Sequence, residues 1–403
     1  MTEVSLASAK RTAILLSIAQ AVLGSAAPIA ISMGALAGQY LLGPDKSLAT
    51  APVTGFNVGV ALGAIPAAFL LRKLGGKLGF MSGALLTAIG GALAAASLFQ
   101  GSFWAFVISL AILGLGGAFV QQIRVAAADN SPTEFKAQAI SWVLAGGILS
   151  AVLGPQAVIL TREAFAPVMF AGAYVAIIGF ALAGMLVLIP ISFAKVRTAA
   201  ENQADLDDAR PFREIVAQPK FIIALTCAVG SYALMSFVMT GAPLAMVACG
   251  HSVDNATLGI QWHVLAMFGP SFFTGRLITM FGKEKIIATG LLILISCALV
   301  AMAGVQLWNF WTSLVLLGLG WNFGFIGSTA LFTETYRLSE KGKVQGFHDF
   351  VLFGSVALSS LFAGKVLDDY GWNTVNGVIF PVVFICLAAL AALTISGRRK
   401  AAA

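Results

Sequence analysis

Long apolar runs alternate with short polar segments along the whole chain. Each run is long enough to cross a lipid bilayer, because a spanning helix needs about 20 mainly apolar residues. Proline and glycine inside the runs do not argue against helices, since neighbouring helices in a membrane satisfy the backbone groups that they free. We predict spans over residues 12–38, 51–71, 78–99, 103–124, 138–160 and 166–190, followed by 220–246, 256–280, 286–305, 309–333, 345–366 and 372–396.

The composition indicates a protein embedded in lipid. Of 403 residues, 59% are hydrophobic and only 10% are charged, whereas soluble proteins carry about 25% charged residues. The net charge of +7 comes from short basic clusters between apolar runs. Such clusters are typical of cytoplasmic membrane loops rather than of a nucleic-acid-binding surface. We therefore expect membrane lipid as a partner and no nucleic acid.

The basic residues also predict the topology. If the N-terminus is cytoplasmic, all but three of the 24 Lys and Arg residues fall on the cytoplasmic side, the exceptions being Lys46, Arg162 and Lys365. An even number of crossings then places both termini in the cytoplasm. The first run is too long for the apolar region of a signal peptide, so we expect it to remain as a helix.

The two halves of the chain repeat. A shift of 207 residues aligns Gly75 with Gly282, Lys136 with Lys343 and Gly147 with Gly354. This shift suggests duplication and predicts two parallel six-helix halves with a substrate site between them. We expect an N-terminal half at 1–191, a cytoplasmic linker at 192–218 and a C-terminal half at 219–403. The linker is either a solvated tether with one surface helix or a regulatory docking site.

The number of spans, the linker and the repeat together resemble the major facilitator superfamily over nearly the whole chain. The loop between the second and third spans of that family usually carries a glycine, an acidic residue, a basic residue and another glycine. The second copy here keeps Gly275, Gly282 and Lys283 but has Thr279 where the acid belongs; the first copy has Arg72 there. The usual acid-based gate contact is therefore not expected.

Features of exporters and proton-coupled members are only partly present. The fifth span holds Gly154 and Pro155 without the trailing glycines, and the fourth has Leu110 in place of a common arginine. Similarity to bacterial facilitators proposed as riboflavin importers is found in the segments GSAAPIAISMGALAG, ISWVLAGGILS, YALMSFVMTGAPLAM and GFHDFVLFGS. The resemblance implies an all-α protein of the bacterial inner membrane, working as a monomer by alternating access, with spans one, four, seven and ten around a central cavity.

Polar and aromatic residues within the spans are the candidate substrate ligands. No Asp or Glu lies deep in a span, Asp349 being the deepest, which favours a neutral or weakly charged, planar solute. Aromatic rings can stack on such a solute while amides orient it. The alternative is that these groups hold helices together. The candidates are Gln20, Tyr232, Gln261, Trp262, Trp321, Asn322 and Phe325.

Four further residues are candidates for coupling and gating. His263 lies two turns into span eight, and His348 precedes Asp349 at the inner end of span eleven. Either site is structural or carries a coupling proton, and uncoupled facilitation is the rival. Arg72 and Asp349 are expected to pair when the inside is closed. Alternatively, Arg72 meets lipid phosphates while Asp349 caps its helix or pairs with Arg124.

The sequence holds no metal-ligand spacing and no nucleotide-binding phosphate loop, so we expect neither an enzyme, nor a metal, nor another cofactor, nor ATP-driven transport. The predicted function is secondary uptake of a small planar solute, riboflavin being the specific hypothesis. Efflux of drugs or metabolites is the alternative, and a non-transporting sensor on the same fold is a further one.

Overall fold

The computed structural model describes residues 6–402 except 45, 133 and 194–209, and this part of the chain contains helices and no strand. The first half comprises α1 (Leu6–Leu23), α2 (Ala26–Leu41), α3 (Ala51–Phe99), α4 (Phe103–Val120), α5 (Ile123–Asp129), α6 (Lys136–Thr161) and α7 (Ala171–Leu188). The second comprises α8 (Phe212–Val216), α9 (Pro219–Ala248), α10 (Val253–Phe268), α11 (Ser271–Phe281), α12 (Lys283–Met302), α13 (Leu307–Phe332), η2 (Leu338–Glu340), α14 (Lys341–Gly377) and α15 (Ile379–Ala402).

By length and apolar character, the described helices supply twelve candidate crossings, in agreement with the predicted number. Nine helical stretches are long and apolar enough to cross, and α10 with α11 forms a tenth that is bent by 42°. Two of the nine hold two crossings each. One is α3, which turns back at Gly75, and the other is the stretch from α14 to α15, which turns back at Gly371; both glycines have non-helical backbone angles.

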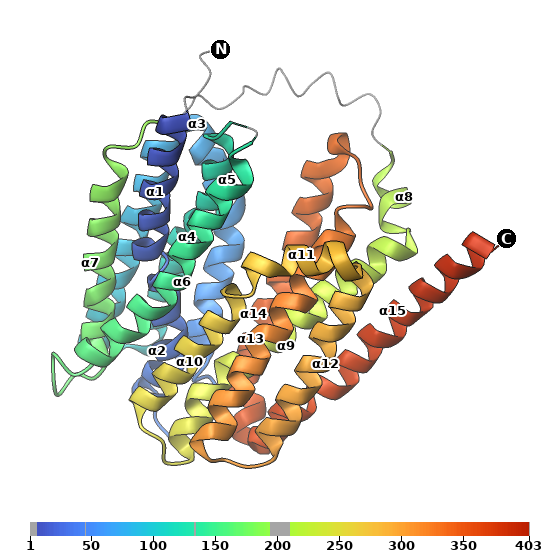
Figure 1. Cartoon of the computed structure of the whole chain (residues 1–403). Helices are drawn as coiled ribbons and strands as arrows, with labels where there is room; N and C mark the ends of the chain where they lie inside the picture. Colours follow the sequence, from blue (N-terminus) through green and yellow to red (C-terminus); the bar gives the residue numbers. More distant parts are fainter. Residues whose placement is uncertain (1–5, 45, 133, 194–209, 403) are drawn as a thin grey trace.

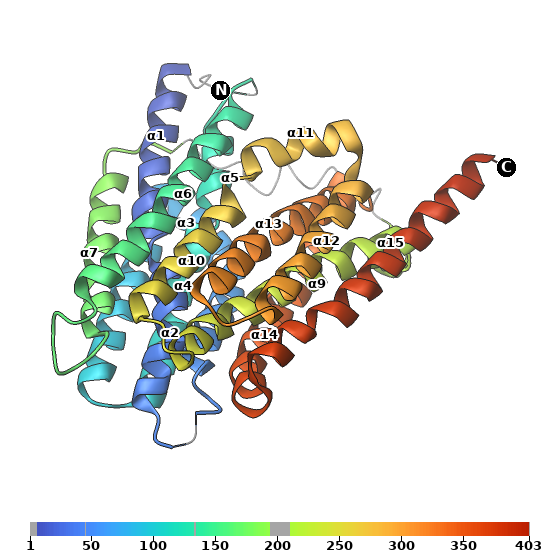
Figure 2. The same cartoon turned by 60° about the horizontal axis from the view of Figure 1, so that its bottom comes forward.

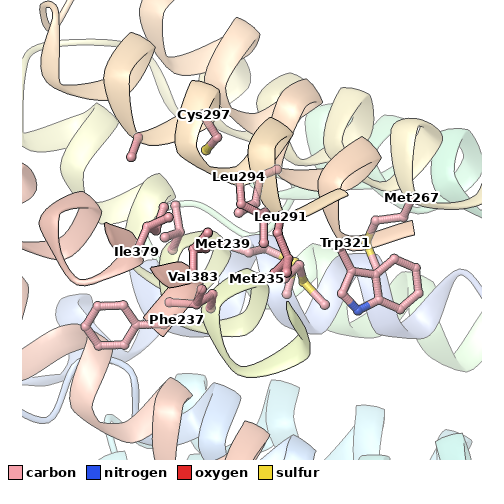
Figure 3. Close-up of a cluster of buried hydrophobic side chains, with 14 of the residues drawn as sticks. Met235, Phe237, Met239, Met267, Leu291, Leu294, Cys297, Trp321, Ile379 and Val383 are labelled. Carbon is pink, nitrogen blue, oxygen red and sulfur yellow. The ribbon is translucent and has the colours of Figure 1, made fainter. Parts of the chain in front are cut away.

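The helices form two bundles that stand side by side, α1–α7 in one and α9–α15 in the other (Figure 1). Most buried apolar residues of each cluster belong to one bundle, although Ala151 of α6 joins the cluster of the second bundle and Leu244 of α9 joins one cluster of the first. Figure 3 shows part of the second, where Met235 of α9, Leu291 of α12 and Val383 of α15 meet. Because most of each core lies inside one bundle, one bundle can move against the other without exposing most of either core.

The predicted repeat is present in the backbone. Gly75 has φ 79° and ψ 164°, and Gly282, 207 residues later, has φ 90° and ψ 154°. Positive φ values of this kind are accessible to glycine and strained for other residues. The two glycines therefore end corresponding helices with the same sharp turn.

Glycine also brings helices of the first bundle into direct contact. A Cβ at Gly59 of α3 would lie 2.0 Å from the carbonyl oxygen of Ala111, and one at Gly114 of α4 would lie 2.1 Å from that of Phe56. No side chain fits at either position. Close approach of this kind gives membrane helices their packing energy, because apolar surface gains nothing by leaving lipid.

Helix boundaries differ from the predictions at both ends of the chain. The first span is divided at Gly24 and Ser25 into α1 and α2. The last long helix begins at Ile379 instead of 372, because residues 372–377 form a short helical segment at the end of α14, after the non-helical Gly371. Trp372 of this segment is buried against Phe310 of α13, with ring centroids 5.2 Å apart, and this packing separates the segment from the last span.

Most of the predicted linker, residues 194–209, lies outside the described residues, but its end is anchored on the second bundle. Glu340 is 4% exposed and accepts hydrogen bonds from the backbone N, Nε and Nη2 of Arg210 and from the backbone N of Arg337. The Arg210 guanidinium is the main cause that lowers the pKa of Glu340 from 4.5 to about 2. Nearby, the exposed Glu334 pairs with Lys220 and Lys283.

We expect Glu340→Gln to lower the free energy of unfolding by about 2 kcal/mol, because charge-assisted hydrogen bonds to a buried carboxylate are lost. Glu334→Gln is the matched control and should cost less than about 1 kcal/mol, since its partners are solvated. A lowered carboxyl pKa stabilises the fold above the unfolded value and loses that contribution as pH falls. Thermal unfolding in detergent should therefore show the Glu340→Gln deficit shrinking between pH 4.5 and about 2; equal melting of both variants at neutral pH would contradict the anchor.

Candidate functional site

A cavity of about 1380 Å³, including its open mouth, lies between the two bundles. The first bundle contributes residues of α1–α6 and the second contributes residues of α9, α10 and α14. Its polar lining consists of Gln20, Asn57, Thr87, Gln121, Arg124, Ser150, Tyr232 and Ser236. No residue of α13, the tenth span, is part of the lining. The wall that the family resemblance assigned to that span is instead formed by α10 and α14.

The cavity opens toward one face of the molecule. We call the face at which α1 begins and α15 ends the terminal face (Figure 1). Gln121 and Arg124, both exposed lining residues, lie where α4 ends and α5 begins, on the side of the cavity nearer the terminal face.

Contacts between the bundles close the cavity at the opposite face, which Figure 2 brings forward. Arg162 at the end of α6 pairs with Asp254 of α10. Gln156 of α6 donates a hydrogen bond to Gln261 of α10 at 2.9 Å. Further bonds join Thr54 to Ser360 (3.1 Å) and the Thr50 hydroxyl to the carbonyl of Leu361 (3.2 Å). The described conformation is therefore closed at the opposite face and open at the terminal face.

Two of the predicted ligands, Gln20 and Tyr232, line the cavity. The Tyr232 ring meets Trp321 and Phe325 edge-on, with centroids 5.3 and 5.1 Å away, and those two rings stack on each other at 5.2 Å. Trp321 is only 6% exposed, and its Nε1 has no partner among the described residues (Figure 3). Trp321 and Phe325 thus support Tyr232 from behind.

The structure does not bring the other three predicted ligands to the cavity. Asn322 is fully buried; it donates to the Met267 carbonyl (2.6 Å) and to Ser271 (2.8 Å) and accepts from Thr274 (2.6 Å). These bonds hold the bend between α10 and α11. Gln261 is engaged with Gln156, and Trp262 is 45% exposed on the outer surface of the bundle.

Both histidines of the predicted coupling sites are buried. His263 bonds through Nδ1 to the Leu314 carbonyl at 2.8 Å, and its Nε2 has no partner in the described chain. His348 packs on Phe332 at 4.4 Å and bonds through Nδ1 to Asp349 at 2.9 Å. Asp349 therefore has a local partner in this conformation. Within the described ranges, no group of three His, Cys, Asp or Glu residues is placed to hold a metal.

Sequence reasoning missed several lining residues. Asn57 is the one amide in the predicted span 51–71, and that feature is the signal that could have identified it; Ser150 shares its span with other polar residues and has no such signal. Arg124 is the last residue of the predicted span 103–124, a position where a basic residue is typical of a cytoplasmic boundary. The sequence pattern does not distinguish lining methionines and phenylalanines from core residues; the lining ones are Phe56, Met235, Met239, Met267, Phe268 and Phe353.

Comparisons with known proteins agree with this architecture. A riboflavin transporter of Brucella anthropi, RfnT, is 48% identical over 382 residues, which cover 95% of each chain. Two uncharacterized transporters of Bacillus subtilis, YdeG and YddS, of the same superfamily type, are each 28% identical over 93% of this chain and 91% and 89% of their own. Among solved structures, a D-xylose–proton symporter superposes with a TM-score of 0.73, covering 96% of this chain and 97% of its own at 14% identity.

The family model of the Major Facilitator Superfamily matches residues 12–354 and 263–402. Together, these matches span nearly the whole chain, and the fold agrees with them. The apolar helices belong to a multi-pass membrane protein whose relatives are transporters. The chain is a member of the major facilitator superfamily.

Proposed function

We propose that this protein takes up riboflavin or a closely similar planar solute by alternating access. The observation that carries the proposal is the 48% identity to a riboflavin transporter over 95% of both chains. The chemistry of the cavity supports it. Tyr232, Phe268 and Phe353 offer ring faces, while Gln20 and Asn57 offer amides that donate and accept hydrogen bonds. Among the described residues, no carboxylate lines the cavity, which suits a solute without positive charge.

We further propose that the protein lies in the bacterial inner membrane with both termini in the cytoplasm. The excess of lysine and arginine on the loops of the terminal face supports this orientation. The described conformation is then open to the cytoplasm. Residues 1–191 and 219–403 rock against each other as two rigid halves joined by the linker at 192–218, and a monomer in lipid suffices. No catalytic activity and no cofactor are proposed.

Efflux of amphipathic compounds is the second candidate. Met235, Met239 and Met267 line one wall of the cavity, and flexible methionine surfaces adapt to varied ligands. The amides on the facing wall favour one specific solute instead, because a buried amide rejects ligands that leave it unpaired.

The proposal includes coupling of uptake to a proton, carried either by the pair of His348 and Asp349 or by His263. The His348–Asp349 pair lies near the terminal face, and His263 lies against α13. Coupled uptake should rise when an inward proton gradient is imposed on vesicles, and uncoupled facilitation should not respond.

The transport proposal predicts saturable riboflavin counterflow. Proteoliposomes preloaded with unlabelled riboflavin should accumulate labelled riboflavin transiently without ATP, because a carrier exchanges solute faster than it returns empty. Empty liposomes are the control. Riboflavin binding without flux would indicate a sensor, and counterflow of varied drugs but not of riboflavin would indicate an exporter.

The site predicts different outcomes for two amides. Gln20→Ala should weaken riboflavin binding about 5- to 100-fold with little change in melting temperature, because Gln20 faces the cavity. Asn322→Ala should lower the melting temperature, because it leaves the bend of α10 and α11 without three hydrogen bonds. Fluorescence titration and thermal unfolding measure both. Normal riboflavin binding by a folded Gln20→Ala variant would remove Gln20 from the site.

The proposed gate pairs Arg72 with Asp349 when the terminal face closes. Both side chains are exposed in the open conformation, and Asp349 contacts His348 there. Arg72→Asp and Asp349→Arg should each favour the open terminal face, and the double exchange should restore closure, since a pair worth about 1.4 kcal/mol changes the ratio of states tenfold. Distances between spin labels on the two halves would report this; a double exchange no better than either single change would exclude the pair.

A further inference from the structure

Among the described residues that line the cavity, Arg124 is the one that carries a charge. It lies in α5, which follows the break in the fourth span at Gln121 and Gln122. Ile123 and Ala127, one helical turn apart, are buried in the core of the first bundle. Their burial fixes the rotation of this short helix and leaves Arg124 exposed on the cavity wall.

No carboxylate neutralises this cation in the described chain. The nearest acids in sequence, Asp129 and Glu134, do not line the cavity, and Asp349 contacts His348. Tyr232 lines the same cavity from the second bundle. A charge without an ion-pair partner on the wall of a membrane cavity is typical of ligand pathways.

We infer that Arg124 determines specificity by binding two adjacent acceptor atoms on the edge of the ligand's ring system. The inference deepens the proposed function and rests on it. A guanidinium presents parallel N–H donors in a fixed plane, which match paired acceptors better than a lysine does. The isoalloxazine ring of riboflavin has two such edges, N1 with O2 and N5 with O4. Tyr232 and Phe268 are placed to contact the ring while Arg124 holds its edge.

The test measures the affinity of each protein variant for each of four ligands in detergent. Binding is monitored by flavin fluorescence. The ligands are riboflavin, its 1-deaza and 5-deaza analogues, each of which replaces one ring acceptor by CH, and riboflavin 5′-phosphate. The variants are Arg124→Met and Arg124→Lys. Arg276→Met is the matched control, because Arg276 is an exposed arginine of α11 that does not line the cavity.

Wild-type protein should bind one deaza analogue about tenfold more weakly than it binds riboflavin. The Arg124→Met variant should bind riboflavin about 10- to 100-fold more weakly than wild type does, and it should bind that analogue and riboflavin with equal affinity. Arg124→Lys should also bind riboflavin and the analogue with equal affinity, because lysine keeps the charge but lacks the parallel N–H donors of the guanidinium. Arg276→Met should bind like wild type. Unchanged melting temperatures without ligand would show that the variants fold.

Three outcomes would overturn the inference. If Arg124→Met binds riboflavin like wild type, or still discriminates between riboflavin and the analogue, Arg124 does not hold the ring edge. If Arg124→Met weakens the binding of riboflavin 5′-phosphate alone, Arg124 attracts anions in general and does not recognise the ring. If wild-type protein binds no riboflavin, the proposed function fails and the flavin assignment of Arg124 fails with it, whereas the first two outcomes leave the proposed function intact.

Discussion

Lipid offers no hydrogen bonds, and this constraint explains most of the structure. Every backbone group must be satisfied within its own segment or by protein neighbours, so the described chain is helical throughout its spans. The same constraint acts on side chains. Asn322 makes three bonds at the one bent span of its bundle, and Gln261 finds Gln156 on the other bundle. A polar group that remains without such partners, as Arg124 does, is stable only where it meets water or a ligand.

The fold was predictable because the signals that define it are long and repeated. Each span is an apolar run, and the offset of 207 residues reappears as matching backbone angles at Gly75 and Gly282. Boundaries were less predictable where tertiary contacts decide them. Trp372 is apolar enough to belong to a span, but its contact with Phe310 holds it in the short helical segment before the last span.

The site was only partly predictable, since an apolar helix has no polar face to reveal its rotation. Gln20 and Tyr232 reach the cavity, whereas Trp321 and Asn322, which share the tenth span, lie behind the lining. Tilt and rotation depend on packing against neighbouring helices. In the first bundle, the contacts of Gly59 and Gly114 set that packing, and sequence spacing does not reveal which face they leave toward the cavity.

The distribution of polar contacts between the bundles also bears on how the protein changes state. Most of each core lies within one bundle, so the conformational equilibrium depends on the contacts that cross between bundles. At the opposite face the polar contacts are the Arg162–Asp254 pair and the Gln156–Gln261 bond between the α6 region and α10, and the bonds of Thr54 and Thr50 to α14. A ligand that bridges Arg124 and Tyr232 would add a connection at the other end of the same interface. Such a ligand favours closure around itself if it binds the closed state more tightly, because a ligand shifts an equilibrium only by its differential affinity for the open and closed states. The same cavity residues therefore serve recognition and the conformational change.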